Sequence, residues 1–185
     1  MRLIYSSYYQ KIMGVLRFLI VRLFYRNKLK IKGIGLIGSN CGFFIRSTGR
    51  MEVSGRMILQ DQVMLYTHGK MTIGSNLQVN SYSRIVAHEE ITIGNNVSIG
   101  RFVTILDHDH HYDIKDNGDL TLGGYETAPI HIGSNIWLGD KCTVLIGVTI
   151  GDNVVAAAHT LIHKDVPPNS LIFGVPYKII KNLNP

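Results

Sequence analysis

Aliphatic residues recur every six positions through the middle of the chain, and a small residue commonly follows each of them. Clear examples are Ile93-Gly94, Ile99-Gly100, Ile132-Gly133, Leu138-Gly139 and Ile150-Gly151. Strands of an ordinary β-sandwich alternate with period two and show no sixfold register. The period therefore predicts an all-β solenoid, a parallel β-helix with three hexads per coil and a core of aliphatic side chains. We expect glycine at the corners because it tolerates backbone dihedrals that bulky residues do not.

The register divides the repeat into about five coils. Their hexads begin at Val53, Leu59, Leu65; Ile73, Val79, Ile85; Ile93, Ile99, Ile105; Ile132, Leu138, Val144; and Ile150, Ala156, Ile162. The third coil is followed by an interruption, which we assign to a long polar loop at 111–129, since long loops in compact repeats are often functional. The expected division is an N-terminal helical segment at 1–30, the solenoid at 31–168 and a C-terminal extension at 169–185, with 31–50 not phased.

Residues 12–25 form the strongest apolar stretch, but Arg17 and Arg22 interrupt it. It falls short of the roughly 18–20 apolar residues of a membrane span and fits a cleavable signal peptide poorly. On a helical wheel, one half carries cations (Lys11, Arg17, Arg22, Arg26, Lys28) and the other apolar residues (Ile12, Leu16, Leu19, Ile20, Leu23, Phe24). The pattern predicts an amphipathic helix, which either lies on an anionic membrane surface or packs on the fold or a neighbouring subunit.

Composition supports one packed domain. Of 185 residues, 45% are apolar and 17% charged, which excludes a disordered chain. The two cysteines, Cys41 and Cys142, do not make a disulfide scaffold and fit a reducing compartment. The net charge of +6 comes with no nucleic-acid-binding motif, so we expect no nucleic-acid partner.

Several motifs together resemble a known family. They are Asn76-Leu77-Gln78-Val79-Asn80, Asp107-His108-Asp109-His110, Ile136-Trp137-Leu138-Gly139, Lys164-Asp165-Val166-Pro167 and Gly174-Val175-Pro176-Tyr177-Lys178. Over roughly residues 70–181 the chain resembles the hexapeptide-repeat acyltransferases, in the branch of maltose, galactoside and lipopolysaccharide O-acetyltransferases, and most of all those of lipopolysaccharide and capsule. The resemblance implies a left-handed coil and a homotrimer with active sites between subunits. With the cysteine usage and the amphipathic helix, we expect a cytoplasmic location, with peripheral contact at the inner face of the membrane through the helix.

The resemblance further implies transfer of an acetyl group from acetyl-CoA to a sugar hydroxyl, in lipopolysaccharide, O-antigen or capsular polysaccharide biosynthesis. A histidine acts as general base in this family, and imidazole suits that role because it titrates near neutral pH. Counting the hexad from Ile105 places His110 at the family position, with His108 as the second candidate and His111 already in the loop. Asn80 is expected to hold the acceptor or the catalytic geometry, with a plain turn residue as the alternative, and Tyr82 to contact the sugar. Trp137, outside the core stack, either borders the sugar pocket or packs at an interface.

Acetyl-CoA is expected along the last coils. The residues that the resemblance assigns to it are Asp140, Ala158, His163, Lys164, Lys178 and Lys181. His163 departs from the usual threonine and Asp140 from a small residue. Lys178 stands where arginine is common, which keeps the charge and loses the bidentate fork.

Three alternatives remain open. Zinc carbonic anhydrases of the gamma type share the fold, and the cluster of His108, His110 and His111 invites a metal. Its spacing is tighter than theirs, so we expect no metal. N-acetylation of an amino sugar and a non-catalytic scaffold are the others.

Overall fold

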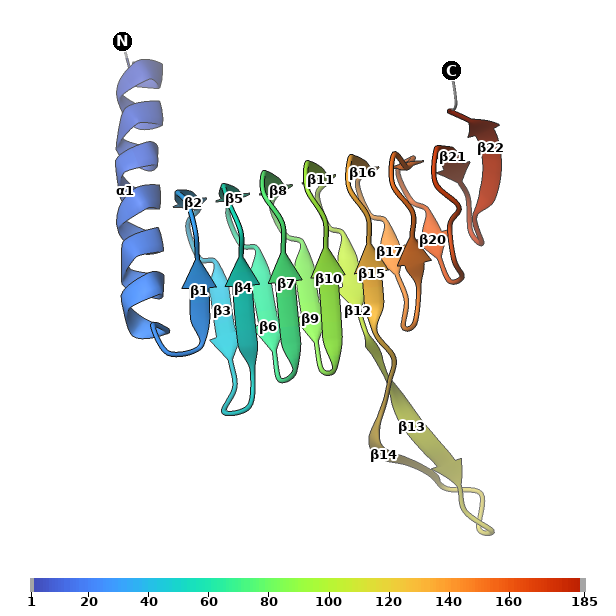
Figure 1. Cartoon of the computed structure of the whole chain (residues 1–185). Helices are drawn as coiled ribbons and strands as arrows, with labels where there is room; N and C mark the ends of the chain where they lie inside the picture. Colours follow the sequence, from blue (N-terminus) through green and yellow to red (C-terminus); the bar gives the residue numbers. More distant parts are fainter. Residues whose placement is uncertain (1, 184–185) are drawn as a thin grey trace.

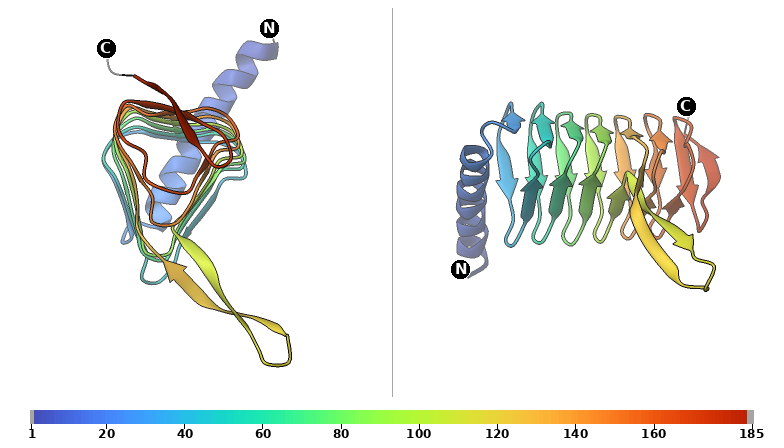
Figure 2. Two further views of the ribbon diagram at one scale, coloured as in Figure 1. Left: turned by 90° about the vertical axis from the view of Figure 1, so that its right-hand side faces the viewer. Right: turned by 90° about the horizontal axis from the view of Figure 1, so that it is seen from below.

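The chain forms a triangular solenoid capped by one helix, and the computed structural model describes residues 2–183, with side chains from residue 8. Three parallel sheets make the faces of the prism, and each coil contributes one strand to each sheet (Figures 1 and 2). Face A consists of β1 (Leu29–Ile31), β4 (Arg50–Val53), β7 (Lys70–Ile73), β10 (Glu90–Ile93), β15 (Ile130–Ile132) and β18 (Thr149–Ile150). Face B consists of β2 (Gly35–Ile37), β5 (Met57–Leu59), β8 (Leu77–Val79), β11 (Val97–Ile99), β16 (Ile136–Leu138), β19 (Val155–Ala156), β21 (Ser170–Phe173) and β22 (Lys178–Asn182). Face C consists of β3 (Gly42–Ile45), β6 (Met64–Thr67), β9 (Arg84–Ala87), β12 (Thr104–Leu106), β17 (Thr143–Val144) and β20 (Leu161–Ile162).

The predicted solenoid is confirmed, and it has more turns than the sequence indicated. Six coils are complete, and β21 with the bridge between Ile150 and Val166 makes part of a seventh. The additional first coil, β1 to β3, occupies the stretch that the hexad count did not phase. Leu29 pairs with Met51, 22 positions later, whereas Met51 pairs with Met71, 20 positions later. The wider first turn explains why the regular count failed there.

The expected reason for the corner glycines is wrong. Gly94 is not among the glycines with positive φ, and the left-handed conformation falls instead on asparagines such as Asn96 (φ 56°). The coils approach too closely for a side chain, since a Cβ on Gly94 would lie 2.7 Å from backbone atoms of Gly133. The asparagine amides hydrogen-bond along the axis, as Asn96 Nδ2 does to Asn135 Oδ1 at 3.1 Å. These bonds tie neighbouring coils together at the corner between faces A and B.

Helix α1 (Arg2–Phe24) lies across the open end of the first coil (Figure 1). It packs on β2 through Gly14 and Phe18, and Phe18 is 3% exposed. Arg17, assigned by the wheel to the polar half, turns toward the solenoid and donates to the Ile37 carbonyl at 3.3 Å. The predicted apolar half of the wheel is therefore not the packing face. No helix within residues 2–183 is long and apolar enough to cross a bilayer.

The interruption of the repeat is a β-hairpin. Strands β13 (His108–Ile114) and β14 (Leu120–Thr127) pair antiparallel and project from the prism between β12 and β15, after the fourth coil (Figure 2). It begins at His108 rather than at residue 111, because Asp107 is the last buried residue of the coil. At the opposite end from α1, β22 folds back antiparallel on β21, and buried Tyr177 covers the core.

Candidate functional site

Asp107 anchors the base of the hairpin. Its side chain is fully buried, and its two carboxylate oxygens accept hydrogen bonds from the backbone N–H groups of His88 (2.7 Å) and Glu89 (2.8 Å). Both donors belong to the preceding coil. Charge-assisted bonds of this kind are stronger than neutral ones. Asp107 therefore holds a fixed negative charge at the point where the chain leaves the prism.

His108 follows directly and is oriented by that charge. Its Nδ1 lies 3.5 Å from Asp107 Oδ1, and the imidazole is 13% exposed. This nitrogen is buried without a hydrogen-bond partner among the described residues, so a proton on Nδ1 facing the carboxylate is the favoured tautomer. The lone pair is then on Nε2. A carboxylate behind one nitrogen and a free lone pair on the other is the arrangement of a general base, and such contacts are often long in unliganded enzymes.

Two further rings hold His108 in place. The His88 ring stacks on it at 3.9 Å between centroids, and Tyr125 meets it edge-on at 5.3 Å. Burial, above all, lowers the pKa of His88, and the neighbouring His108 and His68 add to the effect. His88 is therefore uncharged at neutral pH and stacks on His108 without charge repulsion.

His110 lies on the same side of β13 as His108, because strand side chains alternate. It pairs with Tyr125 of β14, and the two ring centroids are 4.8 Å apart. Its side chain is exposed, and among the described residues no carboxylate lies within ion-pair distance of its imidazole. His111 falls at a register shift of the hairpin and pairs with exposed Asp113 at 3.5 Å. The structure thus separates the three histidines by their surroundings.

The predicted acceptor residues lie at another corner. Asn80 and Tyr82 follow β8, between faces B and C, whereas His108 follows β12, between faces C and A. Trp137 points outward from β16 on face B and is 59% exposed. One chain therefore does not bring these side chains beside His108.

The sequence analysis missed an aromatic pair at that corner. The Tyr82 ring stacks on Phe102 of the next coil, with centroids 4.9 Å apart and planes at 8°. Both residues have positive φ, which is uncommon for bulky side chains, and the Arg101 guanidinium lies 5.5 Å from the Phe102 ring. The signal was present as an aromatic residue at the same corner position of two successive coils.

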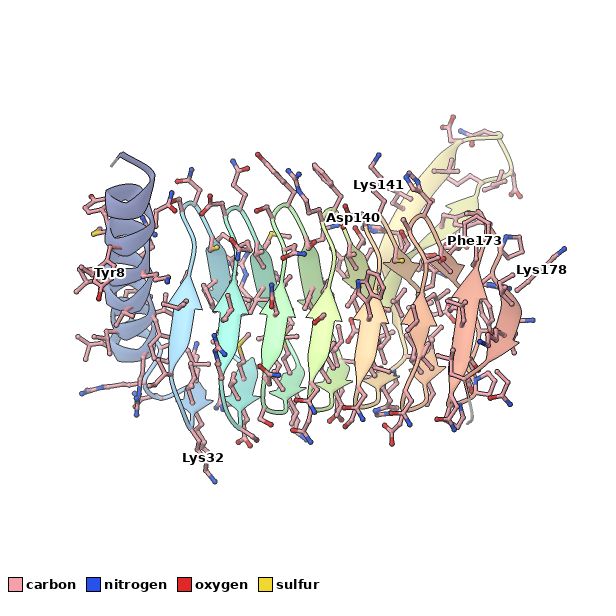
Figure 3. The ribbon with its side chains drawn as sticks, turned by 90° about the horizontal axis from the view of Figure 1, so that it is seen from above. Tyr8, Lys32, Asp140, Lys141, Phe173 and Lys178 are labelled. Atoms are coloured by element: carbon pink, nitrogen blue, oxygen red, sulfur yellow. The ribbon has the colours of Figure 1, made fainter. Side chains whose placement is uncertain are left out.

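The residues expected to bind acetyl-CoA are split between three places. Asp140 and Ala158 occupy the corner between faces B and C, and Asp140 accepts a hydrogen bond from the Arg101 N–H at 2.7 Å, which gives it a structural role (Figure 3). His163 and Lys164 follow β20 at the corner between faces C and A. Lys178 and Lys181 lie exposed on β22, at the end far from α1 (Figure 3).

Tyr177 connects two of these places. The His163 ring lies 5.9 Å from the Tyr177 ring, and the Lys164 ammonium lies 5.5 Å from it. The Tyr177 hydroxyl donates to the Asp165 carbonyl, and burial raises its pKa, with Asp165 adding to the effect. Lys178 is the next residue along the chain, so a cationic surface forms around the last turn.

Within the described side chains, no group of three or more His, Cys, Asp or Glu residues has the geometry of a metal site. The zinc alternative therefore gains no support from the arrangement of His108, His110 and His111.

No protein-family model matches the chain. Among curated proteins, it is 39% identical over 77 residues to galactoside O-acetyltransferase of Escherichia coli K12, covering 42% of this chain and 36% of that one. It is 44% identical over 59 residues to WbbJ of the same organism, a candidate lipopolysaccharide biosynthesis O-acetyl transferase, covering 32% and 30%. The alignments thus span about a third of these relatives.

Solved structures resemble the chain over most of its length. AntD, an N-acyltransferase from Bacillus cereus in complex with dTDP and 3-hydroxybutyryl-CoA, has a TM-score of 0.72 at 16% identity, covering 88% of both chains. The hexapeptide-repeat acetyltransferase VCA0836 of Vibrio cholerae, complexed with acetyl coenzyme A, has a TM-score of 0.51 at 21% identity, covering 86% and 74%. The chain is therefore similar in sequence, over a partial segment, to O-acetyltransferases, and it shares its fold with AntD and VCA0836.

Proposed function

We propose that the protein transfers an acetyl group from acetyl-CoA to a sugar hydroxyl during lipopolysaccharide, O-antigen or capsular polysaccharide assembly. The observation that carries this proposal is the His108 imidazole, oriented by buried Asp107 at the base of the hairpin. The partial similarity to galactoside O-acetyltransferase supports the reaction, and that to WbbJ supports the acceptor class.

In the proposed reaction, His108 Nε2 accepts the proton of the acceptor hydroxyl while that oxygen attacks the thioester carbonyl. The tetrahedral intermediate collapses by breaking the carbon–sulfur bond, and the imidazolium returns the proton to the CoA sulfur. Asp107 keeps the imidazole in the required tautomer and stabilises its protonated form, as the acidic member of a catalytic triad does. We assign the base to His108 rather than to His110 because, of these two histidines, only His108 has a carboxylate within ion-pair distance among the described residues.

We propose that a homotrimer completes the site. Asn80, Tyr82 and Trp137 lie on a different part of the prism from His108, and packing three prisms around an axis places one corner of a chain beside another corner of its neighbour. In this arrangement the Tyr82–Phe102 pair of one subunit offers an aromatic surface to the sugar beside His108 of the next.

The phosphates of acetyl-CoA are assigned to the cationic surface of Lys164, Lys178 and Lys181. Lysine serves there as a point charge and lacks the bidentate geometry of arginine. Asp140 and His163 stay predictions of cofactor contact, with Asp140 already engaged by Arg101.

The test is incubation of the protein with labelled acetyl-CoA and a panel of lipid-linked and nucleotide-linked glycans, followed by mass spectrometry. We expect one added acetyl group that mild base removes, as an ester. An alkali-stable amide would instead indicate N-acetylation, and unmodified glycans with a demonstrably folded protein would contradict the proposal.

A further inference from the structure

Positive charge is concentrated at the end of the molecule that carries α1. The first 51 residues contain ten Lys and Arg and no Asp or Glu, a formal charge of +10. The other nine Lys and Arg share the rest of the chain with all 13 Asp and Glu, a formal charge of −4. This asymmetry is large for a chain with a total of +6, and it points to an anionic partner at the α1 end.

The outer face of α1 is apolar and exposed. It packs on the solenoid through Gly14 and Phe18, which leaves the apolar residues of the other sides largely exposed to solvent. These exposed residues are Tyr8, Tyr9, Ile12, Leu16, Leu19, Ile20, Leu23 and Phe24, each between 45% and 78% exposed. An exposed apolar patch of this kind marks an interaction surface.

Cations border this face on both sides. On one side, a groove lined by Leu19 and Leu23 also contains Arg22, Arg26 and Lys30. On the other, a cleft of about 340 Å³ lies between one side of α1 and the first two coils.

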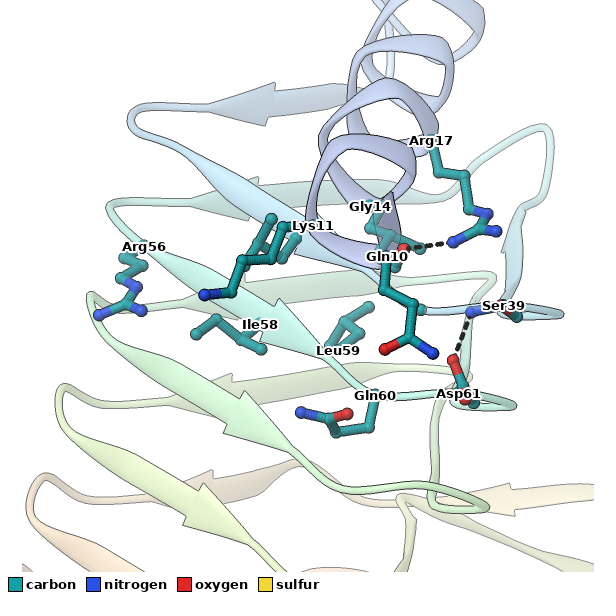
Figure 4. A pocket seen from close by; sticks show the side chains of 13 residues that line it. Gln10, Lys11, Gly14, Arg17, Ser39, Arg56, Ile58, Leu59, Gln60 and Asp61 are labelled. Carbon is teal, nitrogen blue, oxygen red and sulfur yellow. Dashed lines mark hydrogen bonds between the residues drawn. The ribbon is translucent and has the colours of Figure 1, made fainter. Parts of the chain in front are cut away.

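That cleft is lined by cationic and amide side chains. Figure 4 shows Lys11, Arg17 and Arg56 around it, together with Gln10 and Gln60. Asp61 also lines this cleft, and its carboxylate accepts the Ser39 N–H at 2.6 Å. These donors suit a phosphodiester, so the cleft and the apolar face together match the two parts of a phospholipid.

We propose that the outer face of α1 docks on an anionic phospholipid bilayer and holds the solenoid upright on it. An interfacial helix ordinarily binds in this way: its apolar side chains lie at the boundary of the acyl chains, and its cations are attracted to anionic headgroups. A second copy of this chain is a poorer occupant, because the α1 ends of both copies are cationic and would repel each other.

The orientation defines the acceptor more closely, and this step rests on the proposed function. Helix α1 lies across the end of the prism, so its outer face is turned away from the coils along the solenoid axis (Figures 1 and 2). His108 follows the fourth coil; with a rise of about 4.8 Å per coil and a helix about 10 Å thick, it stands roughly 25 Å above the bilayer. At this distance from the bilayer, a lipid headgroup would not reach His108. A sugar on a glycan that extends from a lipid carrier would reach it.

Flotation with vesicles tests the docking directly. We compare full-length protein on phosphatidylcholine vesicles with and without phosphatidylglycerol, and expect binding to the anionic vesicles that weakens as salt rises. The variant Ile20→Glu/Leu23→Glu changes only exposed side chains and should bind at least tenfold more weakly. The control Ile114→Glu/Leu122→Glu adds the same charge at exposed positions of the hairpin and should bind like wild type.

Equal binding by wild type and the Ile20→Glu/Leu23→Glu variant, or equal loss in the control, would overturn the proposal. Light scattering without vesicles gives a further test. If the wild type has twice the mass of the variant, a second copy of the chain covers the outer face of α1, and the proposal is overturned.

Acetylation provides a separate readout. Both Ile20→Glu/Leu23→Glu and wild type should acetylate a water-soluble glycan equally, whereas only wild type should favour the lipid-linked form in anionic vesicles. If wild type transfers acetyl groups but uses the soluble and the lipid-linked glycan equally well, the upright geometry is overturned, whereas the proposed reaction is not. Vesicle binding with no transfer to any glycan would overturn the reaction and leave the docking.

Discussion

At the scale of single residues, two histidines on one side of β13 have different surroundings. His108 lies between the His88 and Tyr125 rings with Asp107 behind it, while His110 is exposed beside Tyr125. Because catalysis by a positioned base requires a defined tautomer and rotamer, these contacts make His108 the stronger candidate.

His108→Ala should therefore lower turnover by about 10²–10⁴-fold, the usual contribution of a positioned general base. His110→Ala should lower it by less than about tenfold, since its imidazole has no orienting carboxylate among the described residues. Initial rates with labelled acetyl-CoA measure both, and acetyl-CoA binding by calorimetry is the control for folding. The reverse ranking would restore the register count that indicated His110.

The His88 ring provides a prediction about pH. Burial lowers its pKa below the ordinary value of 6.5, so as pH falls through 6.5 the unfolded chain takes up this proton before the folded chain does. The contribution of neutral His88 to the free energy of unfolding is therefore fully present above pH 6.5 and decreases as the pH falls below 6.5. His88→Phe keeps a ring against His108 without the titration, so its melting temperature should fall less than that of wild type between pH 7 and pH 5. Parallel curves for the two proteins would show that His88 has no such role.

At the scale of elements, β22 carries the cations assigned to acetyl-CoA. It pairs with β21 and leaves Lys178 and Lys181 exposed. Buried Tyr177, the residue before this strand, has the Lys164 ammonium 5.5 Å from its ring. The strand therefore acts both as an end cap for the core and as a charged surface.

Lys178→Ala should raise the KM for acetyl-CoA about tenfold and leave kcat unchanged, because a phosphate contact far from the thioester stabilises ground and transition states equally. Lys178→Arg preserves the charge and should stay close to wild type. Lys115→Ala removes an exposed lysine at the hairpin tip and serves as the matched control. A change in kcat alone would place Lys178 outside the cofactor site.

At the scale of the whole molecule, the residues proposed for the site lie at two corners of one prism, which is the reason for proposing a trimer. Asn80 lies between faces B and C in the third coil, and His108 lies between faces C and A after the fourth. In the proposed cyclic trimer they would be neighbours across a subunit boundary.

Co-folding equal amounts of His108→Ala and Asn80→Ala chains should restore activity that neither variant has alone. A site is intact where a chain with native His108 precedes one with native Asn80, so random trimers should recover about a quarter of wild-type activity. Mass spectrometry of the intact assemblies confirms the mixing. Mixed trimers without activity would place both residues in one site of one chain.

The sequence by itself determined the solenoid, its long interruption and the presence of an N-terminal helix. A sixfold aliphatic period is a local property that each coil repeats, so residues such as Ile93 and Ile99 report the core without knowledge of their neighbours. The first coil escaped this reasoning because its turn is two residues longer than the next one, which breaks the register with the hexads that follow.

Only the tertiary structure decided which side of α1 packs and which histidine is oriented. The helix is apolar on several sides, and the choice of Phe18 follows from its fit over Gly35, where a Cβ would meet its ring. His108 acquires its setting from Asp107, whose carboxylate is held by backbone N–H groups 18 and 19 positions earlier in the chain. Such contacts join successive coils, and a count along one hexad does not contain them.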